Sequence, residues 1–163
     1  MDAELYDSEA DRRGPHGWNS LENYTFIHEK RLAEHPFVDH GVPNTLKFED
    51  YVNVDGDTVV LLSGEVYCHY GIVVAVTKSF ETRMVQGRLQ VRGVSYRYNA
   101  RIRGRHNILR YDNGHDESPD EFHRHQYDLS NGTEIETRII TRYDLPVFDD
   151  ILTELQQMFE ETP

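Results

Sequence analysis

Cysteine is almost absent from this sequence, because Cys68 is the only one among 163 residues. A single cysteine cannot form an intrachain disulfide, which excludes a disulfide framework and suits a reducing, intracellular setting. Long apolar runs are also missing: the longest, Gly71–Val76, is far shorter than the roughly 20 residues that cross a bilayer. No signal-peptide pattern opens the chain. We therefore expect a soluble, cytoplasmic protein with no membrane partner.

Lysine is scarce as well, since only three of the 17 basic residues are Lys, against 29 acidic residues and a net charge of −12. This balance is typical of proteins from a salt-rich cytoplasm, which is a hint about habitat and not about function. The arginines are unevenly placed. Eight of them, and no acid, lie between Arg83 and Arg110.

A chain of this length most simply forms one domain. We expect residues 1–44 to be an N-terminal extension, partly disordered or helical, with a helix at Ser20–His35. Residues 45–163 are predicted to form a single α+β domain, in which Asp55-Gly56 and Asn131-Gly132 mark hairpins. Alternation of apolar and polar residues, and richness in Val, Ile and Tyr over Glu65–Lys78, indicate strands. The predicted strands are Leu46–Asn53, Thr58–Leu62, Glu65–Lys78, Arg88–Arg103, His106–Tyr111, Phe122–Leu129 and Glu134–Arg142.

The end of the chain, Asp144–Glu161, places its apolar residues at helical spacing and predicts an amphipathic helix. Pro146 is expected in its first turn, where proline is tolerated. A run of strands followed by one such helix predicts a curved antiparallel β-sheet with the C-terminal helix packed on one face.

The stretch Arg110–Asp128 contains an unusual density of groups that transfer protons or bind metal ions. His123 and His125 are two residues apart, so both imidazoles share one face of a strand. Asp112 and His115 precede an acidic loop, where a chain reversal could bring them opposite this histidine pair. A reactive centre, if the protein has one, is expected here.

Three interpretations of this cluster stay open. The first is metal-independent phosphoryl chemistry on RNA, with His123 and His125 as general base and acid, Arg110 as the cation, and Asp112 and His115 orienting or assisting. The second is a zinc, manganese or nickel site made by the same four histidine and aspartate side chains. The third is structural, with the histidines hydrogen-bonded to nearby acids on a polar sheet face.

The arginines suggest a binding surface. Arg97, Arg101 and Arg103 share one face of their predicted strand, and Arg110 follows on the next strand. Guanidinium groups hold phosphate or carboxylate through paired hydrogen bonds, which favours a phosphate-binding surface leading to the histidines. Pairing with acids elsewhere in the chain, or docking of an acidic partner protein, would explain the same pattern.

Other titratable residues are expected to play smaller roles. The scattered histidines His16, His28, His35 and His40 are predicted to be exposed to solvent. Cys68 lies among Val and Tyr and is predicted to be a packing residue of the core, not a nucleophile.

Four segments carry a family resemblance: Tyr96–Tyr98 (YRY), Ile108–His115 (ILRYDNGH), His123–His125 (HRH) and Asp144–Pro146 (DLP). Together they make the chain, over Gly64–Phe159, similar to the TumE-like family, small prokaryotic proteins classed as toxins of toxin–antitoxin pairs. The resemblance implies a cytoplasmic protein that is encoded beside a DNA-binding antitoxin and neutralised by it. It implies no catalytic residue roles.

Residues and resemblance together lead us to expect a toxin that acts on nucleic acid, as a ribonuclease that requires no cofactor. Arg97, Arg101, Arg103 and Arg110 are expected to hold phosphate. The alternatives are a non-catalytic module that docks an acidic partner or nucleic acid, and a metal-dependent hydrolase. A homodimer through an exposed edge strand is compatible with each of them.

Overall fold

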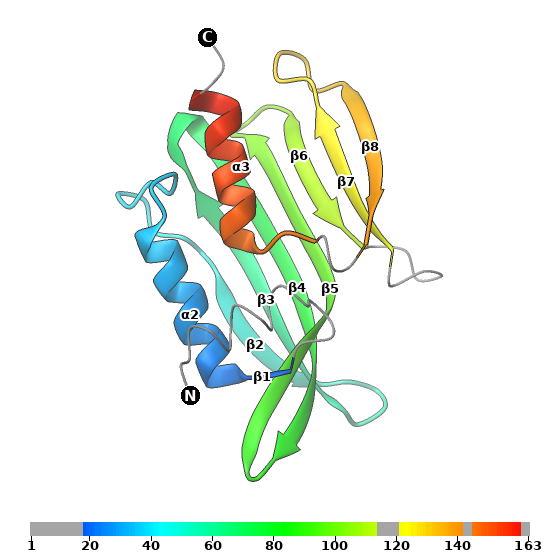
Figure 1. The fold of residues 1–163 in the computed structure, drawn as a ribbon. Helices are drawn as coiled ribbons and strands as arrows, with labels where there is room; N and C mark the ends of the chain where they lie inside the picture. Colours follow the sequence, from blue (N-terminus) through cyan, green and yellow to red (C-terminus); the bar gives the residue numbers. More distant parts are fainter. Residues whose placement is uncertain (1–17, 114–120, 142–144, 161–163) are drawn as a thin grey trace.

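The computed structural model describes residues 18–113, 121–141 and 145–160 (Figure 1). Its strands pair antiparallel in the order β2-β3-β4-β5-β6-β7-β8, and the short β1 pairs with β5. The sheet is open, and a helix ends the described chain, which confirms the α+β class. In chain order the elements are β1 (Asn19–Ser20), α2 (Leu21–Glu34), β2 (Lys47–Val52), β3 (Thr58–Tyr67), η2 (His69–Gly71), β4 (Ile72–Val85), β5 (Arg88–Ile102), β6 (Asn107–Asp112), β7 (Phe122–Tyr127), β8 (Glu134–Ile140) and α3 (Phe148–Glu160).

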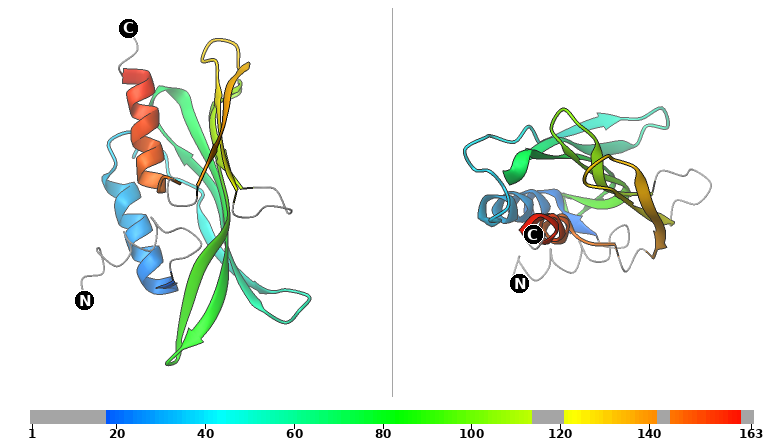
Figure 2. Two further views of the ribbon diagram at one scale, coloured as in Figure 1. Left: turned by 45° about the vertical axis from the view of Figure 1, so that its right-hand side comes forward. Right: turned by 90° about the horizontal axis from the view of Figure 1, so that it is seen from above.

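Helices α2 and α3 lie on the same side of the sheet (Figure 2), which we call the helix face. Ser20 caps the N-terminus of α2, because its hydroxyl accepts a hydrogen bond from the Asn23 amide at 3.1 Å. The core lies between helices and sheet, and α3 contributes Phe148, Ile151, Leu152 and Leu155 to it. No described helix covers the opposite side of the sheet, which we call the open face.

The predicted strand Glu65–Lys78 is wrong, because the chain reverses in its middle and forms the β3–β4 hairpin. Tyr70 and Gly71 adopt positive φ angles of 61° and 72°, and the Cys68 amide donates to the Ile72 carbonyl at 2.8 Å. Apolar residues continue on both sides of the turn, so hydrophobic periodicity alone does not mark it.

Helix α3 begins at Phe148, later than the sequence predicts. Pro146 disfavours helical backbone at the residue before it, and Leu145–Val147 is accordingly non-helical. Asp144, the first residue of the predicted helix, lies outside the described residues. The two hairpins predicted at Gly56 and Gly132 are confirmed, and both glycines have positive φ.

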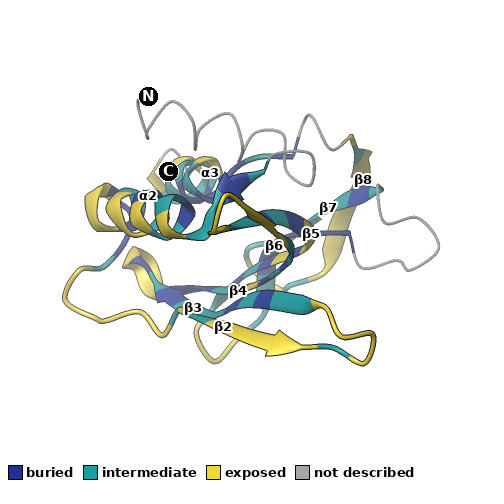
Figure 3. Ribbon diagram, turned by 90° about the horizontal axis from the view of Figure 1, so that it is seen from below, coloured by how far each residue is buried: buried dark blue, intermediate teal, exposed yellow. Residues whose placement is uncertain are grey.

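Exposure differs sharply between the middle of the sheet and its edges. Figure 3 shows that the edge strands β2 and β8 are largely exposed, whereas the central strands carry most of the buried residues. None of the described helices has the length and apolar character needed to span a membrane.

Candidate functional site

The register of β6 and β7 places four predicted site residues in two facing pairs. Asp112 lies opposite His123, and Arg110 lies opposite His125. Since alternate residues of a strand point to the same side, all four side chains share one face of the sheet. We call Arg110, Asp112, His123 and His125 the histidine site.

The intervening residues identify which face this is. The Tyr111 hydroxyl donates to the Glu154 carboxylate of α3 at 2.9 Å, and Arg124 Nη2 donates to the same carboxylate at 2.7 Å. Burial, together with the Glu154 charge, raises the pKa of Tyr111 to about 12. Tyr111 and Arg124 therefore belong to the helix face, and the histidine site belongs to the open face.

The histidine site is compact and largely shielded from solvent. Ligand atoms of Asp112, His123 and His125 all lie within 4.8 Å of one another. The side chains of these residues are only 8%, 12% and 13% exposed, respectively. Together these three residues offer one carboxylate and two imidazoles to a substrate or a metal ion.

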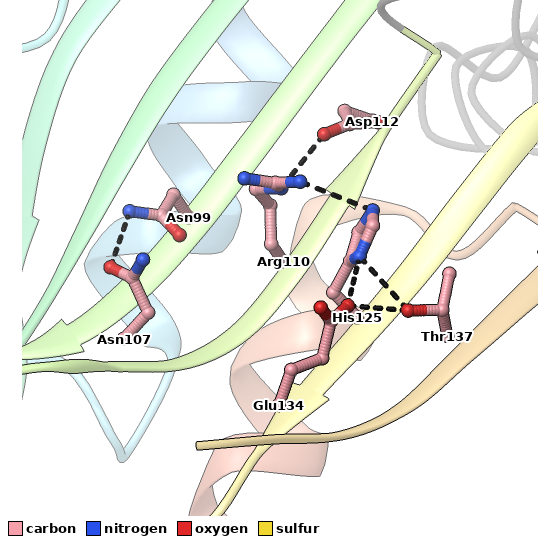
Figure 4. Close-up of polar contacts among 7 residues, drawn as sticks. All are labelled: Asn99, Asn107, Arg110, Asp112, His125, Glu134 and Thr137. Carbon is pink, nitrogen blue, oxygen red and sulfur yellow. Dashed lines mark hydrogen bonds and ion pairs between the residues drawn. The ribbon is translucent and has the colours of Figure 1, made fainter. Parts of the chain in front are cut away.

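Arg110 links two members of the site, as Figure 4 shows. Its Nε forms an ion pair with Asp112 Oδ2 at 2.8 Å, and its Nη2 lies 3.2 Å from His125 Nε2. A guanidinium can only donate, so His125 Nε2 must be the acceptor and carries no proton in this arrangement. The neutral imidazole then has its proton on Nδ1.

Glu134 completes the arrangement from β8 (Figure 4). His125 Nδ1 donates to Glu134 Oε1 at 2.7 Å, and the Thr137 hydroxyl donates to the same oxygen. These hydrogen bonds, first from Thr137 and then from His125, lower the pKa of Glu134 below its ordinary value. An ionised Glu134 fixes both the ring orientation and the tautomer of His125. Sequence reasoning missed this residue.

The β7–β8 turn that positions Glu134 depends on a close contact. Gly132 has a φ of 76°, and a Cβ atom there would collide with the His106 ring. His106 Nε2 is 2.9 Å from the Leu129 carbonyl oxygen. His106 thus supports the hairpin and forms no hydrogen bond or ion pair with the histidine site among the described residues.

His123 has a carboxylate near its ring as well, because its Nε2 lies 3.5 Å from Glu121 Oε1. Its ring and that of His125 meet edge-to-face, with centroids 6.1 Å apart. His115, the remaining predicted member, lies outside the described residues.

The predicted arginine face is only partly assembled. Arg97 lies opposite Asp112, is exposed, and forms no ion pair with any described residue. Arg101 points to the same face but is bound to Glu65 of β3, with Nη2 2.7 Å from Oε2. The prediction that Arg103 continues this strand face is wrong, because β5 ends at Ile102 and Arg103 lies in the following turn.

Cys68 is buried, and this burial raises the pKa of its thiol to about 12, with a further contribution from Asp39. The thiol therefore stays protonated near neutral pH and is not a nucleophile. This agrees with its predicted role in core packing.

Comparisons of the chain with protein-family models, with curated proteins and with solved structures gave no match.

Proposed function

We propose that this protein is a toxin of a toxin–antitoxin pair that cleaves RNA at the histidine site without a metal ion. The observation that carries the proposal is the position of His125 between Arg110 and Glu134. A general base that acts next to a phosphate needs an unprotonated nitrogen, and a nearby cation to bind the phosphate. His125 Nε2 beside Arg110 provides both. Cytoplasmic location and a DNA-binding antitoxin as partner belong to this proposal and are supported by the family resemblance.

The proposed reaction is an attack by the RNA 2′-oxygen on the neighbouring phosphorus. His125 Nε2 takes the proton of the 2′-hydroxyl as the new oxygen–phosphorus bond forms. His123, next to the Glu121 carboxylate, gives a proton to the 5′-oxygen as its bond to phosphorus breaks. The products are a 2′,3′-cyclic phosphate and a free 5′-hydroxyl.

Arginine supplies the positive charge in this scheme. When the RNA binds, its 2′-hydroxyl takes the place of Arg110 as the hydrogen-bond donor to His125 Nε2. The N–H groups of Arg110 can then donate to the phosphate oxygens, where negative charge develops in the transition state. Arg97 lies across from Asp112 and has no acidic partner among the described residues, so it is available to hold an adjacent phosphate.

A metal-dependent hydrolase is the second candidate, and the close approach of Asp112, His123 and His125 favours it. The guanidinium of Arg110, however, lies against two of the three prospective ligands. A metal ion would have to displace this cation, so we favour the metal-independent reaction.

The proposal is tested with purified protein, a synthetic RNA and excess chelator. We expect cleavage that leaves a 2′,3′-cyclic phosphate, and no cleavage of DNA, which lacks the 2′-hydroxyl. His123→Ala and His125→Ala should each lower the rate by about 100-fold or more, with little change in melting temperature. His40→Ala, the same change at an exposed histidine outside the site, is the matched control and should keep full activity.

Two results would contradict the proposal. One is RNA that remains intact with the wild-type protein, both in the assay and after expression in cells. The other is full activity in both histidine variants. If Arg97→Glu then abolished RNA binding while the histidine variants bound normally, the protein would be a non-catalytic binding module.

A further inference from the structure

Strand β8 is an edge of the sheet with no further strand beside it in the described part of the chain (Figure 1). Its side chains are exposed except for the half-buried Ile140, and they include two large apolar groups, Ile135 (59%) and Ile139 (65%). An edge of this kind has free backbone donors and acceptors and is a template for another strand. The sequence of β8 indicates which strand fits it.

We propose that β8 pairs antiparallel with β8 of a second copy, about a two-fold axis that passes midway between the two copies of Thr137. In this register Glu136 lies opposite the partner's Arg138. Ile135, where β8 bulges and has no facing residue on β7, lies beside the partner's Ile139. The two-fold axis repeats each pair, so the interface contains two of each. Opposite charges and apolar residues facing each other directly are the pairings that stabilise neighbouring strands.

Other symmetric registers of β8 lose this complementarity. A two-fold axis perpendicular to the sheet keeps side chains on their own face, so each symmetric register is centred on a residue. Centring on Glu136 or on Arg138 places that charge opposite its own copy, which is destabilising. Thr137 is the centre that pairs Glu136 with Arg138 and Ile135 with Ile139.

The other edge of the sheet, β2, carries two adjacent acids at its centre. Its central residues are Glu49 and Asp50. A two-fold axis at either position would set a carboxylate opposite its own copy. Charged residues in an edge strand are a known way to prevent such pairing. In these central registers β2 repels a second copy, whereas the register of β8 centred on Thr137 complements one.

The proposed dimer has a direct consequence for the histidine site. His125 lies opposite Thr137, which is the residue nearest the proposed two-fold axis. Since the axis preserves the faces, both histidine sites would lie on one continuous open face. Their His125 residues would be separated by three strand spacings, about 14 Å. The dimer does not depend on the proposed RNA cleavage, but it would let one extended polyanion contact both sites.

Sedimentation equilibrium over a range of protein concentrations tests the dimer. We expect the wild type to be dimeric, and expect Glu136→Arg and Arg138→Glu each to weaken dimerisation at least tenfold, since each places like charges opposite each other. Mixed in equal amounts, these two variants should form a heterodimer. One variant has arginine at both positions and the other has glutamate at both, so each arginine faces a glutamate across the interface. Circular dichroism checks that both variants are folded.

The mixing experiment also separates the interface from the intrachain contact between Glu136 and Arg138, whose Oε1 and Nε atoms are 3.9 Å apart. That contact is lost in both variants and is not restored by mixing. A monomeric wild type at about 100 µM would overturn the proposal, since this concentration gives ample mass action. A dimer that persists in both single variants would overturn it equally.

Discussion

Arg110 and His125 lie directly opposite each other on β6 and β7, with guanidinium Nη2 3.2 Å from imidazole Nε2. Asp112 binds the other side of the guanidinium, and Glu134 binds the other nitrogen of the ring. The result is a chain of hydrogen bonds and one ion pair that runs from Asp112 through Arg110 and His125 to Glu134. Such a chain holds one neutral tautomer of His125 ready for proton transfer.

The same arrangement predicts how the protein responds to zinc. Arg110→Ala removes a positive charge and frees the Asp112 carboxylate and His125 Nε2, so three ligand atoms become available within 4.8 Å. We expect this variant to bind Zn²⁺ at least tenfold more tightly than the wild type, as measured by isothermal titration calorimetry.

The control for the zinc experiment is Arg97→Ala. This change removes an equal charge from the same sheet face, and the Arg97 side chain forms no hydrogen bond or ion pair with the prospective ligands in the described part of the chain. It should therefore leave zinc affinity nearly unchanged. Stoichiometric zinc binding by the wild type, lost in His123→Ala and unaffected by Arg110→Ala, would instead support the metal-dependent hydrolase.

A second prediction concerns Arg97, which forms no ion pair with a described residue. Arg97→Glu should weaken RNA binding at least tenfold. It should also make the plot of log affinity against log salt concentration less steep, by the equivalent of more than one phosphate contact, because the change removes a positive charge and adds a negative one. Fluorescence anisotropy can measure this in a His125→Ala background, where the RNA stays intact. Salt titrations then give the slope.

Arg88→Glu is the matched control for Arg97→Glu. Arg88 is nine residues away along β5, which corresponds to about 30 Å in an extended strand. It carries the same charge change beside the turn at the other end of the strand. Equal losses of affinity in the two variants would mean that RNA responds only to the net charge, and that the histidine site does not position it.

Part of the site could be predicted from the sequence because strand parity is a local property. His123 and His125 are two residues apart and fall on one face, and the reversal after Asp112 brings that residue opposite His123, as expected. His115 was predicted with them but lies outside the described residues. β6 and β7 are consecutive antiparallel strands, so their facing pairs could be expected from a single reversal of the chain.

Contacts from more distant positions could not be predicted in the same way. Glu134 reaches His125 across a register shift between Gln126 and Tyr127, and no local pattern signals such a bulge. Arg101 forms an ion pair with Glu65 of β3, and the predicted strand Glu65–Lys78 wrongly joined the end of β3 to β4. The turn between β3 and β4 was missed because its first residue with positive φ is Tyr70, and tyrosine seldom adopts this conformation.

His35 provides the last prediction, and it also corrects one made from the sequence. Predicted to be exposed, His35 is only 5% exposed at the end of α2. Its Nδ1 accepts a hydrogen bond from the Phe37 amide at 3.1 Å, and its Nε2 lies 3.0 Å from the Thr153 hydroxyl of α3. Both contacts suit a neutral ring that joins the two helices. A hydrophobic period cannot reveal this role, because it depends on where α3 packs.

Burial lowers the pKa of His35 below 6.5, while Asp149 acts in the opposite direction and His40 adds to the lowering. A histidine whose pKa is lowered in the folded state stabilises the fold above its unfolded pKa, and this stability is lost as the pH falls below about 6.5. We expect urea denaturation to show a lower free energy of unfolding at about pH 5.5 than at about pH 7.5. His35→Gln should reduce that difference, whereas His40→Gln, at an exposed position, should retain most of it. If both variants kept the full wild-type difference, the pH dependence would arise from the carboxylates, and His35 would not be the group that titrates.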